Sequence, residues 1–261
     1  MHPLLQVGPL NLSTGGLLLL ASVLTASSLA SRIAWRREGA ALVSQVESIF
    51  LPAALGALLG ARVWYGVLNW DLYGRDPALF VALRIADLAW PGGLVGGALA
   101  GWLWARARSY DVRALADTAA LALPAAHLVA SAGLLLSGEA FGVPTDLPWG
   151  INLFGAVRHP TQLYYALAAL VTWATLWRGA RVRQPAGVIG TMYVGIHGLT
   201  LLLIEPLRAD SLLLPGGVRA AQLFGLIILV LALVMARPRQ LSPETATGKL
   251  RGREQGTPAG P

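Results

Sequence analysis

The sequence contains no cysteine and few charged residues. Of its 261 residues, 13% are Asp, Glu, Lys or Arg, whereas 55% are hydrophobic. The absence of cysteine excludes disulfides, thiolate zinc sites and a thiol nucleophile supplied by the chain itself. The four histidines, His2, His127, His159 and His197, lack metal-ligand spacing, so the sequence predicts neither a metal site nor a cofactor.

So low a charge content would not keep an ordinary globular domain soluble, and the mean hydropathy of +0.59 indicates a membrane protein. Apolar runs long enough to span a bilayer recur seven times. They cover roughly residues 10–31, 49–69, 91–105, 114–137, 160–177, 186–204 and 218–236. The sequence therefore predicts an all-α, polytopic integral membrane protein with seven transmembrane helices. Residues 1–239 are expected to form the membrane domain and residues 240–261 a disordered cytoplasmic tail.

Positive charge is distributed unevenly among the connections between these runs. Most of the 20 Lys and Arg residues follow the first, third, fifth and seventh runs. Because cytoplasmic connections collect Lys and Arg, the N-terminus is predicted to lie outside and the C-terminus in the cytoplasm. The net charge of +7 then reflects topology and affinity for anionic lipid, and nucleic acid is not an expected partner.

A dense polar cluster directly precedes the fifth apolar run. Pro160 has a fixed φ and suits the first turn of a helix, which places Arg158 and His159 just outside the helix N-terminus. Free backbone N–H groups, the helix dipole and a guanidinium would then face one anion, most simply a phosphate. The alternative is an interfacial anchor, since Arg, His and Tyr often terminate membrane helices where headgroups and water satisfy them.

Other charged residues are predicted to lie at the same external surface. Arg62 falls inside the second run, where a cation costs about 3 kcal/mol or more unless it faces a partner or cavity, or snorkels to the headgroups. Acidic residues follow the fourth and sixth runs, so carboxylates would be available for proton transfer beside an anionic headgroup. The expected cluster comprises Arg62, Glu139, Arg158, His159, Glu205 and Arg208.

Four glycines open the third run, in the segment covering residues 91–98. Glycine lets helix backbones approach closely, and it also permits an irregular path into the membrane. Close helix packing is the default expectation, and the irregular path remains open.

The segment Arg158-His159-Pro160-Thr161-Gln162-Leu163-Tyr164 resembles the Arg-His-Pro-Ser-Gln-Leu-Tyr block of the bacterial prolipoprotein diacylglyceryl transferases. Further stretches occur in the family's order, and the likeness covers about residues 3–236. Residues 60–65 are similar to Gly-x-Arg-x-x-Tyr, 92–96 to Gly-Gly-Leu-Ile-Gly, 138–142 to Gly-Glu-Leu-Trp-Gly and 205–208 to Glu-Phe-Phe-Arg, and Gln222 is similar to the glutamine that opens the last helix.

The resemblance implies a multi-pass enzyme of the bacterial cytoplasmic membrane. It would move diacylglyceryl from phosphatidylglycerol to the lipobox cysteine of a lipoprotein precursor, forming a thioether. Its expected partners are phosphatidylglycerol or another anionic phospholipid, and a lipobox-containing precursor protein. The absence of cysteine fits, because the thiol belongs to the substrate. The expected catalytic residues are Glu139, His159 and Glu205, and the expected headgroup-binding residues are Arg62, Arg158, Gln162, Tyr164 and Arg208.

Several polar positions of the family motifs are different here. Losing guanidiniums from a low-dielectric site would remove several kcal/mol of phosphate stabilisation. The alternative is therefore a catalytically inactive relative that binds phospholipid or lipoprotein precursors. A small transporter would be expected to show an internal repeat, which the sequence lacks. Before Gly-Glu, Ser131 and Leu134 stand where the family has arginine and asparagine. Pro91 replaces the histidine before Gly-Gly-Leu, Leu201 replaces the arginine before the final Glu, and Tyr165 replaces the glutamate that closes the histidine block.

Overall fold

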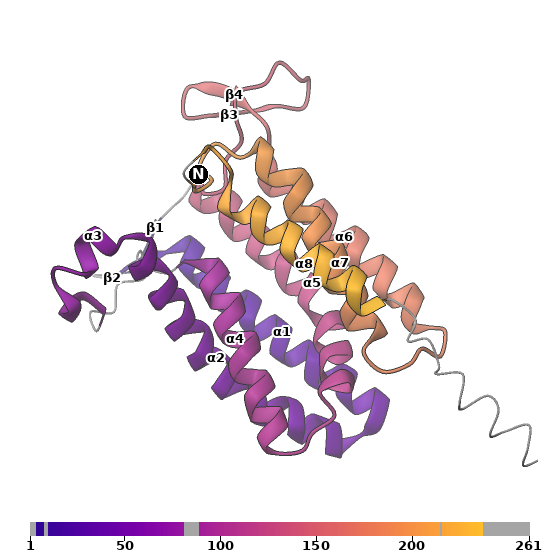
Figure 1. Ribbon diagram of the computed structural model, residues 1–261. Coiled ribbons are helices and arrows are strands. Elements are labelled where there is room, and N and C mark those ends of the chain that lie inside the picture. The colour runs from indigo at the N-terminus through magenta and orange to yellow at the C-terminus, as the bar shows by residue number, and fades with distance from the viewer. Residues whose placement is uncertain (1–3, 8–9, 81–88, 215, 237–261) are drawn as a thin grey trace, which may run out of the picture.

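The computed structural model describes residues 4–7, 10–80, 89–214 and 216–236. Within these residues, the seven apolar runs coincide with seven long helices that pack side by side (Figure 1). They are α1 (Thr14–Glu38), α2 (Ala40–Leu68), α4 (Trp90–Ala107), α5 (Val112–Ser137), α6 (Thr161–Ala180), α7 (Val188–Ile204) and α8 (Ala220–Ala236). The predicted tail at residues 240–261 and the domain boundary at residue 239 lie outside the described residues.

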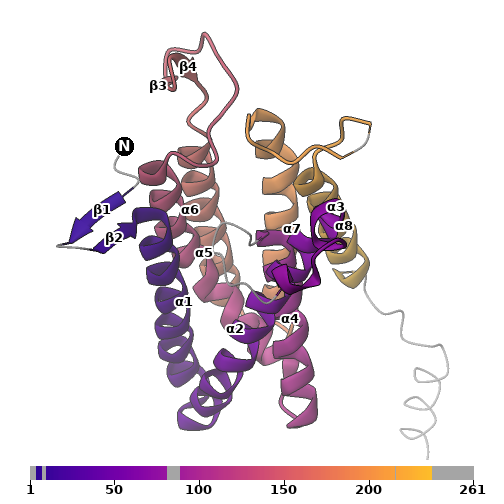
Figure 2. The ribbon, with the colours of Figure 1, turned by 90° about the vertical axis from the view of Figure 1, so that its left-hand side faces the viewer.

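The remaining elements are short. The described residues contain two antiparallel pairs of strands, β1 (Leu4–Val7) with β2 (Leu10–Ser13) and β3 (Ile151–Leu153) with β4 (Ala156–Arg158). Figure 2 shows the β3–β4 hairpin projecting from the end of the bundle at which α6 begins. The short helical segments are α3 (Trp70–Tyr73), η1 (Pro77–Phe80) and η3 (Glu205–Leu207).

The first helix starts later than the hydropathy pattern predicted. Residues 10–13 belong to strand β2, and α1 begins at Thr14 because the Ser13 side chain caps it, accepting a hydrogen bond from the backbone N–H of Gly16 at 3.2 Å. At its other end, α1 continues past residue 31 to Glu38. The pattern located the helix, but the cap decided where it begins.

The composition of the helices indicates an integral membrane protein. Among the described helices, α1, α2, α5 and the segment Val188–Leu207 are each long and apolar enough to cross a membrane, and α8 is a shorter apolar helix. Large hydrophobic side chains are exposed along these helices, including Leu19, Leu20 and Leu24 of α1. Such an apolar surface is suited to contact with the acyl chains of a bilayer.

The helices form two groups that α1 and α5 join. The first group is α1, α2 and α4, and the second is α5, α6, α7 and α8 (Figure 1). Asp117 of α5 fixes the start of α7, because its carboxylate accepts hydrogen bonds from the backbone N–H groups of Gly187 at 2.9 Å and Gly190 at 2.8 Å. This buried carboxylate replaces the local cap that α7 lacks.

Helices α2 and α4 approach each other along facing glycines. A Cβ atom built on Gly60 would lie 2.3 Å from the carbonyl oxygen of Gly92, and one built on Gly96 would lie 2.2 Å from that of Gly56. Pro91 lies in the first turn of α4, and the helix continues unbroken through the glycines. The expectation of close helix packing is confirmed, and the alternative of an irregular path is wrong.

Replacing Gly96 with alanine should loosen this contact. The added methyl group would overlap backbone atoms that can move only if the two helices separate, so we expect Gly96→Ala to lower stability by about 1–3 kcal/mol. Thermal unfolding of the purified protein in detergent measures this loss. Gly93→Ala is the matched control, because its Cβ would lie 3.4 Å from the carbonyl oxygen of Ala57, an ordinary contact. Equal unfolding temperatures for the two variants would contradict the proposed role of the close approach.

Candidate active site

The candidate site lies at the end of the bundle that carries the β3–β4 hairpin. Here α5 ends at Ser137, α6 begins at Thr161 and α7 continues into η3, so three helix ends and their loops meet. As predicted, Arg158 and His159 lie just outside α6, but Pro160 is the residue before the helix and not part of its first turn.

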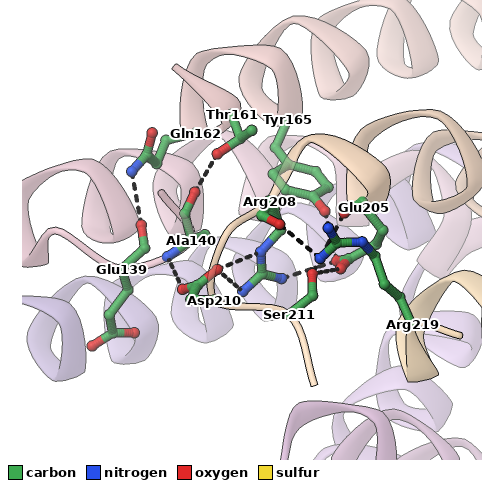
Figure 3. A network of polar contacts seen from close by, with 10 residues as sticks. All are labelled: Glu139, Ala140, Thr161, Gln162, Tyr165, Glu205, Arg208, Asp210, Ser211 and Arg219. Carbon is green, nitrogen blue, oxygen red and sulfur yellow. Dashed lines mark hydrogen bonds and ion pairs between the residues drawn. The ribbon is translucent and has the colours of Figure 1, made fainter. Parts of the chain in front are cut away.

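Glu205 is a fully buried carboxylate whose two oxygens both accept hydrogen bonds (Figure 3). Its Oε1 accepts from the Tyr165 hydroxyl at 2.8 Å and from Nη1 of Arg208 at 2.9 Å. Its Oε2 accepts from the Ser211 hydroxyl at 2.5 Å. A buried carboxylate is tolerated only when it is paired and hydrogen-bonded, so these partners offset the cost of burying Glu205 between α6 and α7.

Arg208 bridges Glu205 to a second carboxylate. Its Nε and Nη2 both lie 3.0 Å from Oδ1 of Asp210. Burial alone would lower the pKa of the Arg208 guanidinium, but the hydrogen bond to Asp210 and the charge of Glu205 raise that pKa above the ordinary arginine value. Arg219 joins the network from the start of α8, donating from Nη1 to the backbone carbonyl of Arg208 at 2.7 Å. Arg208 is therefore permanently charged and held between two acids.

Asp210 in turn fixes the turn that follows α5. Its Oδ2 accepts from the backbone N–H of Ala140 at 2.7 Å, and the carbonyl of Ala140 accepts from the hydroxyl of the buried Thr161. Ala140 has a φ of 52°, in the left-handed region that non-glycine residues rarely adopt. Such a conformation persists when the surroundings over-determine it, and here both polar atoms of the residue are bonded to other elements.

Residues 141–143 run between two other backbone segments. On one side Ala209 donates to the Phe141 carbonyl at 2.9 Å, and Val143 donates to the Leu207 carbonyl at 2.8 Å. On the other side, His159 donates to the Val143 carbonyl at 3.1 Å. Gly142 allows this approach, since a Cβ atom there would lie 2.3 Å from the carbonyl oxygen of His159. The loop after α5 is thus held between the segment that precedes α6 and the segment that follows α7.

Glu139 is exposed, and its carboxylate points away from Arg208 (Figure 3). A Cβ atom built on Gly15, in the first turn of α1, would lie 3.7 Å from Oε1 of Glu139. The backbone carbonyl of Glu139 accepts from Nε2 of Gln162 at 2.8 Å. Gln162 is fully buried, and within the described residues its Oε1 has no partner. The loop therefore holds the Glu139 backbone while leaving the carboxylate accessible.

Arg158 and His159 both contact groups around the hairpin. Arg158 donates from Nε to the Leu153 carbonyl at 3.0 Å and from Nη1 to the Gly142 carbonyl at 3.3 Å, and its guanidinium lies 5.3 Å from the centre of the Phe141 ring. Within the described residues, Arg158 has no carboxylate partner. Its positive charge is therefore not neutralised by a salt bridge.

The His159 side chain is held by a chain of aromatic residues. Its Nδ1 lies 3.2 Å from the Tyr164 hydroxyl, which also accepts from Nε1 of Trp149 at 2.9 Å. The amide N–H groups of Thr161, Leu163 and Tyr164 donate to the carbonyls of His159 and Pro160. The start of α6 therefore offers an anion fewer free donors than the sequence suggested.

Arg62 of α2 is buried. Burial alone does not distinguish a functional residue from one that snorkels to the headgroups. Arg62 donates from Nη2 to the Leu79 carbonyl and from Nε to the Phe80 carbonyl, the latter at 3.4 Å, and its guanidinium lies 5.4 Å from the centre of the Tyr73 ring. These contacts place Arg62 against the segment of α3 and η1. The prediction that it lies beneath the Glu205 cluster gains no support from them.

Comparison with known proteins identifies the family. The family model described as prolipoprotein diacylglyceryl transferase matches residues 2–237. The chain belongs to this family. Two relatives named phosphatidylglycerol–prolipoprotein diacylglyceryl transferase illustrate the similarity. The one from Synechococcus elongatus is 33% identical over 240 residues, covering 86% of this chain and 82% of that protein. The one from Parasynechococcus marenigrum is 34% identical over 253 residues, covering 87% and 90%.

The chain departs from the family motifs at several positions, and the residues found there take part in packing and backbone contacts. Ser131 is buried on α5, and the Leu134 carbonyl accepts from the backbone N–H groups of Gly138 and Glu139. Leu201 of α7 is buried, and a Cβ atom built on Gly225 of α8 would lie 2.7 Å from its Cβ. Tyr165 contributes chemistry of its own, because its hydroxyl binds Glu205.

Sequence reasoning assigned no role to several residues of this transferase site. Asp210 lies two positions after Arg208, and an acid so close to an arginine at a helix end was an available signal. The hydroxyl groups carried no comparable signal, since Tyr and Ser are common at membrane interfaces. The unassigned residues of the network are Tyr165, Asp210, Ser211 and Arg219.

Removing the Asp210 carboxylate should loosen the turn at Ala140. Asp210→Ala leaves one side of Arg208 and the Ala140 N–H without an acceptor, so we expect a loss of about 1–3 kcal/mol in stability. Thermal unfolding in detergent is the measurement. Asp146→Ala is the control, because Asp146 is exposed, and it should unfold within about 0.5 kcal/mol of the wild type. A wild-type unfolding temperature for Asp210→Ala would show that backbone contacts alone hold the loop.

Proposed function

We propose that this chain is a phosphatidylglycerol–prolipoprotein diacylglyceryl transferase of the bacterial cytoplasmic membrane. The observation that carries the proposal is the family match over residues 2–237, joined by relatives of that name that align over most of the chain. The chain has no cysteine, in keeping with a reaction whose thiol comes from the lipobox of the precursor.

The membrane arrangement that we propose has seven spans, with the N-terminus outside. Helices α4, α6 and α8 have 18, 20 and 17 residues, so each is about 25–30 Å long and matches the hydrocarbon core. Arginines lie in the last turns of α1, α4 and α6, and these helices end opposite the β3–β4 hairpin (Figure 1). The positive-inside rule then assigns the hairpin and the Glu205 network to the outer face.

The proposed reaction replaces a carbon–oxygen bond with a carbon–sulfur bond. The precursor's cysteine loses its proton, and its sulfur attacks the diacylglycerol carbon that carries the phosphate. The bond from that carbon to the phosphate oxygen breaks, and glycerol phosphate leaves with the bonding electrons. The protein must therefore favour the thiolate and stabilise the departing phosphate.

The contacts divide these tasks among the expected residues. Glu139 is the candidate base, because its carboxylate is accessible, and His159 is the second candidate. Arg158 is the candidate phosphate ligand, because carbonyls position its guanidinium without cancelling its charge. Glu205 and Arg208 are assigned a positioning role, because they already bind each other and Asp210.

Gln162 and Tyr164 support these groups. Gln162 holds the carbonyl of Glu139, and Tyr164 holds the imidazole of His159. Both are therefore proposed to act through their neighbours. Arg62 is assigned to the segment that contains α3 and η1, and its part in headgroup binding remains a prediction.

A reconstituted transfer assay tests these roles. Purified protein, labelled phosphatidylglycerol and a lipobox peptide should yield a diacylglyceryl thioether detected by mass spectrometry. Glu139→Gln and Arg158→Ala should each reduce the rate by about 100-fold or more, the usual effect of removing a base or an anion-stabilising group. Asp146→Asn and Arg75→Ala are matched controls in exposed loops and should retain the wild-type rate. Normal rates in both test variants would remove the proposed site.

The second candidate is a lipid-binding relative without transferase activity. It is favoured by the uncharged side chains of Ser131 and Leu201 and by the pairing of Arg208 with two carboxylates. This candidate predicts saturable binding of phosphatidylglycerol with no thioether product. Consumption of phosphatidylglycerol in proportion to the lost thiol would exclude it.

A further inference from the structure

A second site lies at the end of the bundle opposite the β3–β4 hairpin. A cavity of about 330 Å³ opens there between the end of α1, the start of α5, the end of α6 and the connection to α7. Its apolar wall includes Ile33, Leu121 and Ile189, which belong to one buried hydrophobic cluster. The cavity is therefore anchored in the packed part of the bundle.

Four arginines line the same cavity from two separate elements. Arg36 and Arg37 lie at the end of α1, and Arg181 and Arg183 lie just after α6. All four are exposed, and within the described residues none of them has a carboxylate partner. Guanidiniums that converge from different helices without counter-ions generate a concentrated positive potential.

The one acid among the described lining residues does not neutralise this charge. Both oxygens of Asp117 accept hydrogen bonds from backbone N–H groups at the start of α7. Its negative charge therefore faces the positive end of the α7 dipole. The arginines remain available for another anion.

An aromatic side chain completes the apolar wall. Trp177 of α6 lines the cavity together with the arginines. Its ring packs against the same buried cluster as Ile33, Leu121 and Ile189, so the apolar surface continues up to the charged rim.

We propose that this cavity binds an anionic glycerophospholipid, with the headgroup phosphate among the four arginines and the glycerol end of the acyl chains against the apolar wall. Guanidinium groups bind phosphate oxygens through paired, charge-assisted hydrogen bonds. The apolar wall and the lipid-facing surface of the adjoining helices favour a lipid over free phosphate. Such a lipid would connect α1 to the α6–α7 connection.

This site is separate from the one proposed for transfer. Helix α7 has 17 residues, and it extends from the cavity at its start to Glu205 at its end, about 25 Å away. The inference therefore does not depend on transferase activity. It requires only that the cavity faces an anionic leaflet.

A single fluorescent label can report occupancy, because the chain has no cysteine. Val182 lines the cavity and is 63% exposed, so Val182→Cys provides one labelling site at its rim. Brominated phosphatidylglycerol titrated into phosphatidylcholine nanodiscs should quench the label saturably. Brominated phosphatidylcholine at the same density should quench it weakly and without saturation. Equal quenching by the two lipids would overturn the proposal.

Charge variants distinguish a built site from general attraction to anionic lipid. Arg181→Gln with Arg183→Gln should weaken phosphatidylglycerol binding by about 30-fold, the effect of losing two lipid-contacting cations. Arg106→Gln with Arg108→Gln is the matched control. It removes the same charge at the same end of the bundle, from side chains that lie over the rings of Trp102 and Trp104, and should bind like the wild type.

Lipid retention by the unlabelled variants, measured by native mass spectrometry, provides a second readout that a disturbed label cannot affect. Size-exclusion chromatography checks that each variant is folded. Equal weakening in the two pairs would mean that the arginines act only as a diffuse positive surface. Displacement of the lipid by millimolar inorganic phosphate would assign the cavity to a free anion. Either result would contradict a phospholipid site.

Discussion

The ion pairs of Arg208 are the interaction on which the candidate active site depends. Arg208 holds Glu205, at the end of α7, and Asp210, two residues further on. Through Asp210 it also reaches Ala140, in the turn that carries Glu139. One half-buried cation therefore joins the end of α7 to the loop after α5. Because the fully buried Glu205 carboxylate would be costly without a partner, its position is tied to that of Arg208.

This pairing also explains which residues are free to meet a substrate. Glu205 and Arg208 neutralise each other and are enclosed by Tyr165 and Ser211, so they act as a support. Glu139 is fixed through its backbone and Arg158 through carbonyl groups, and neither forms a salt bridge within the part of the chain that the structure describes. A phosphate and a thiol require groups of this second kind. The site thus separates the residues that build it from those that are proposed to react.

The sequence predicted the helices well because their signal is local. Each of the seven apolar runs overlaps one helix in the described part of the chain, although α2 begins at Ala40, well before its run at 49–69, and α6 begins one residue after Pro160. The family motifs located the site, and the match over residues 2–237 confirms the resemblance. The start of α1 was missed by a few residues, because the Ser13 cap overrides hydropathy there.

The partners within the site could not be predicted, because they come from residues distant in the sequence. Nothing near Ala140 signals that Asp210 will bind its N–H group and force a left-handed conformation. Arg62 was grouped with the other arginines by depth alone, whereas its contacts depend on how the segment after α3 folds back. Hydropathy reports depth in a membrane, but it does not report which helices face each other.

Amide hydrogen exchange of the segment 138–145 would test the supporting role of Arg208 most directly. If the ion pairs hold this loop, Arg208→Gln should accelerate exchange there by about tenfold or more and leave the glycine contact between α2 and α4 unchanged. The Glu139 carboxylate would then occupy its native position for a smaller fraction of the time. Unchanged exchange in the segment would contradict the account, because it would show that the loop is held without Arg208.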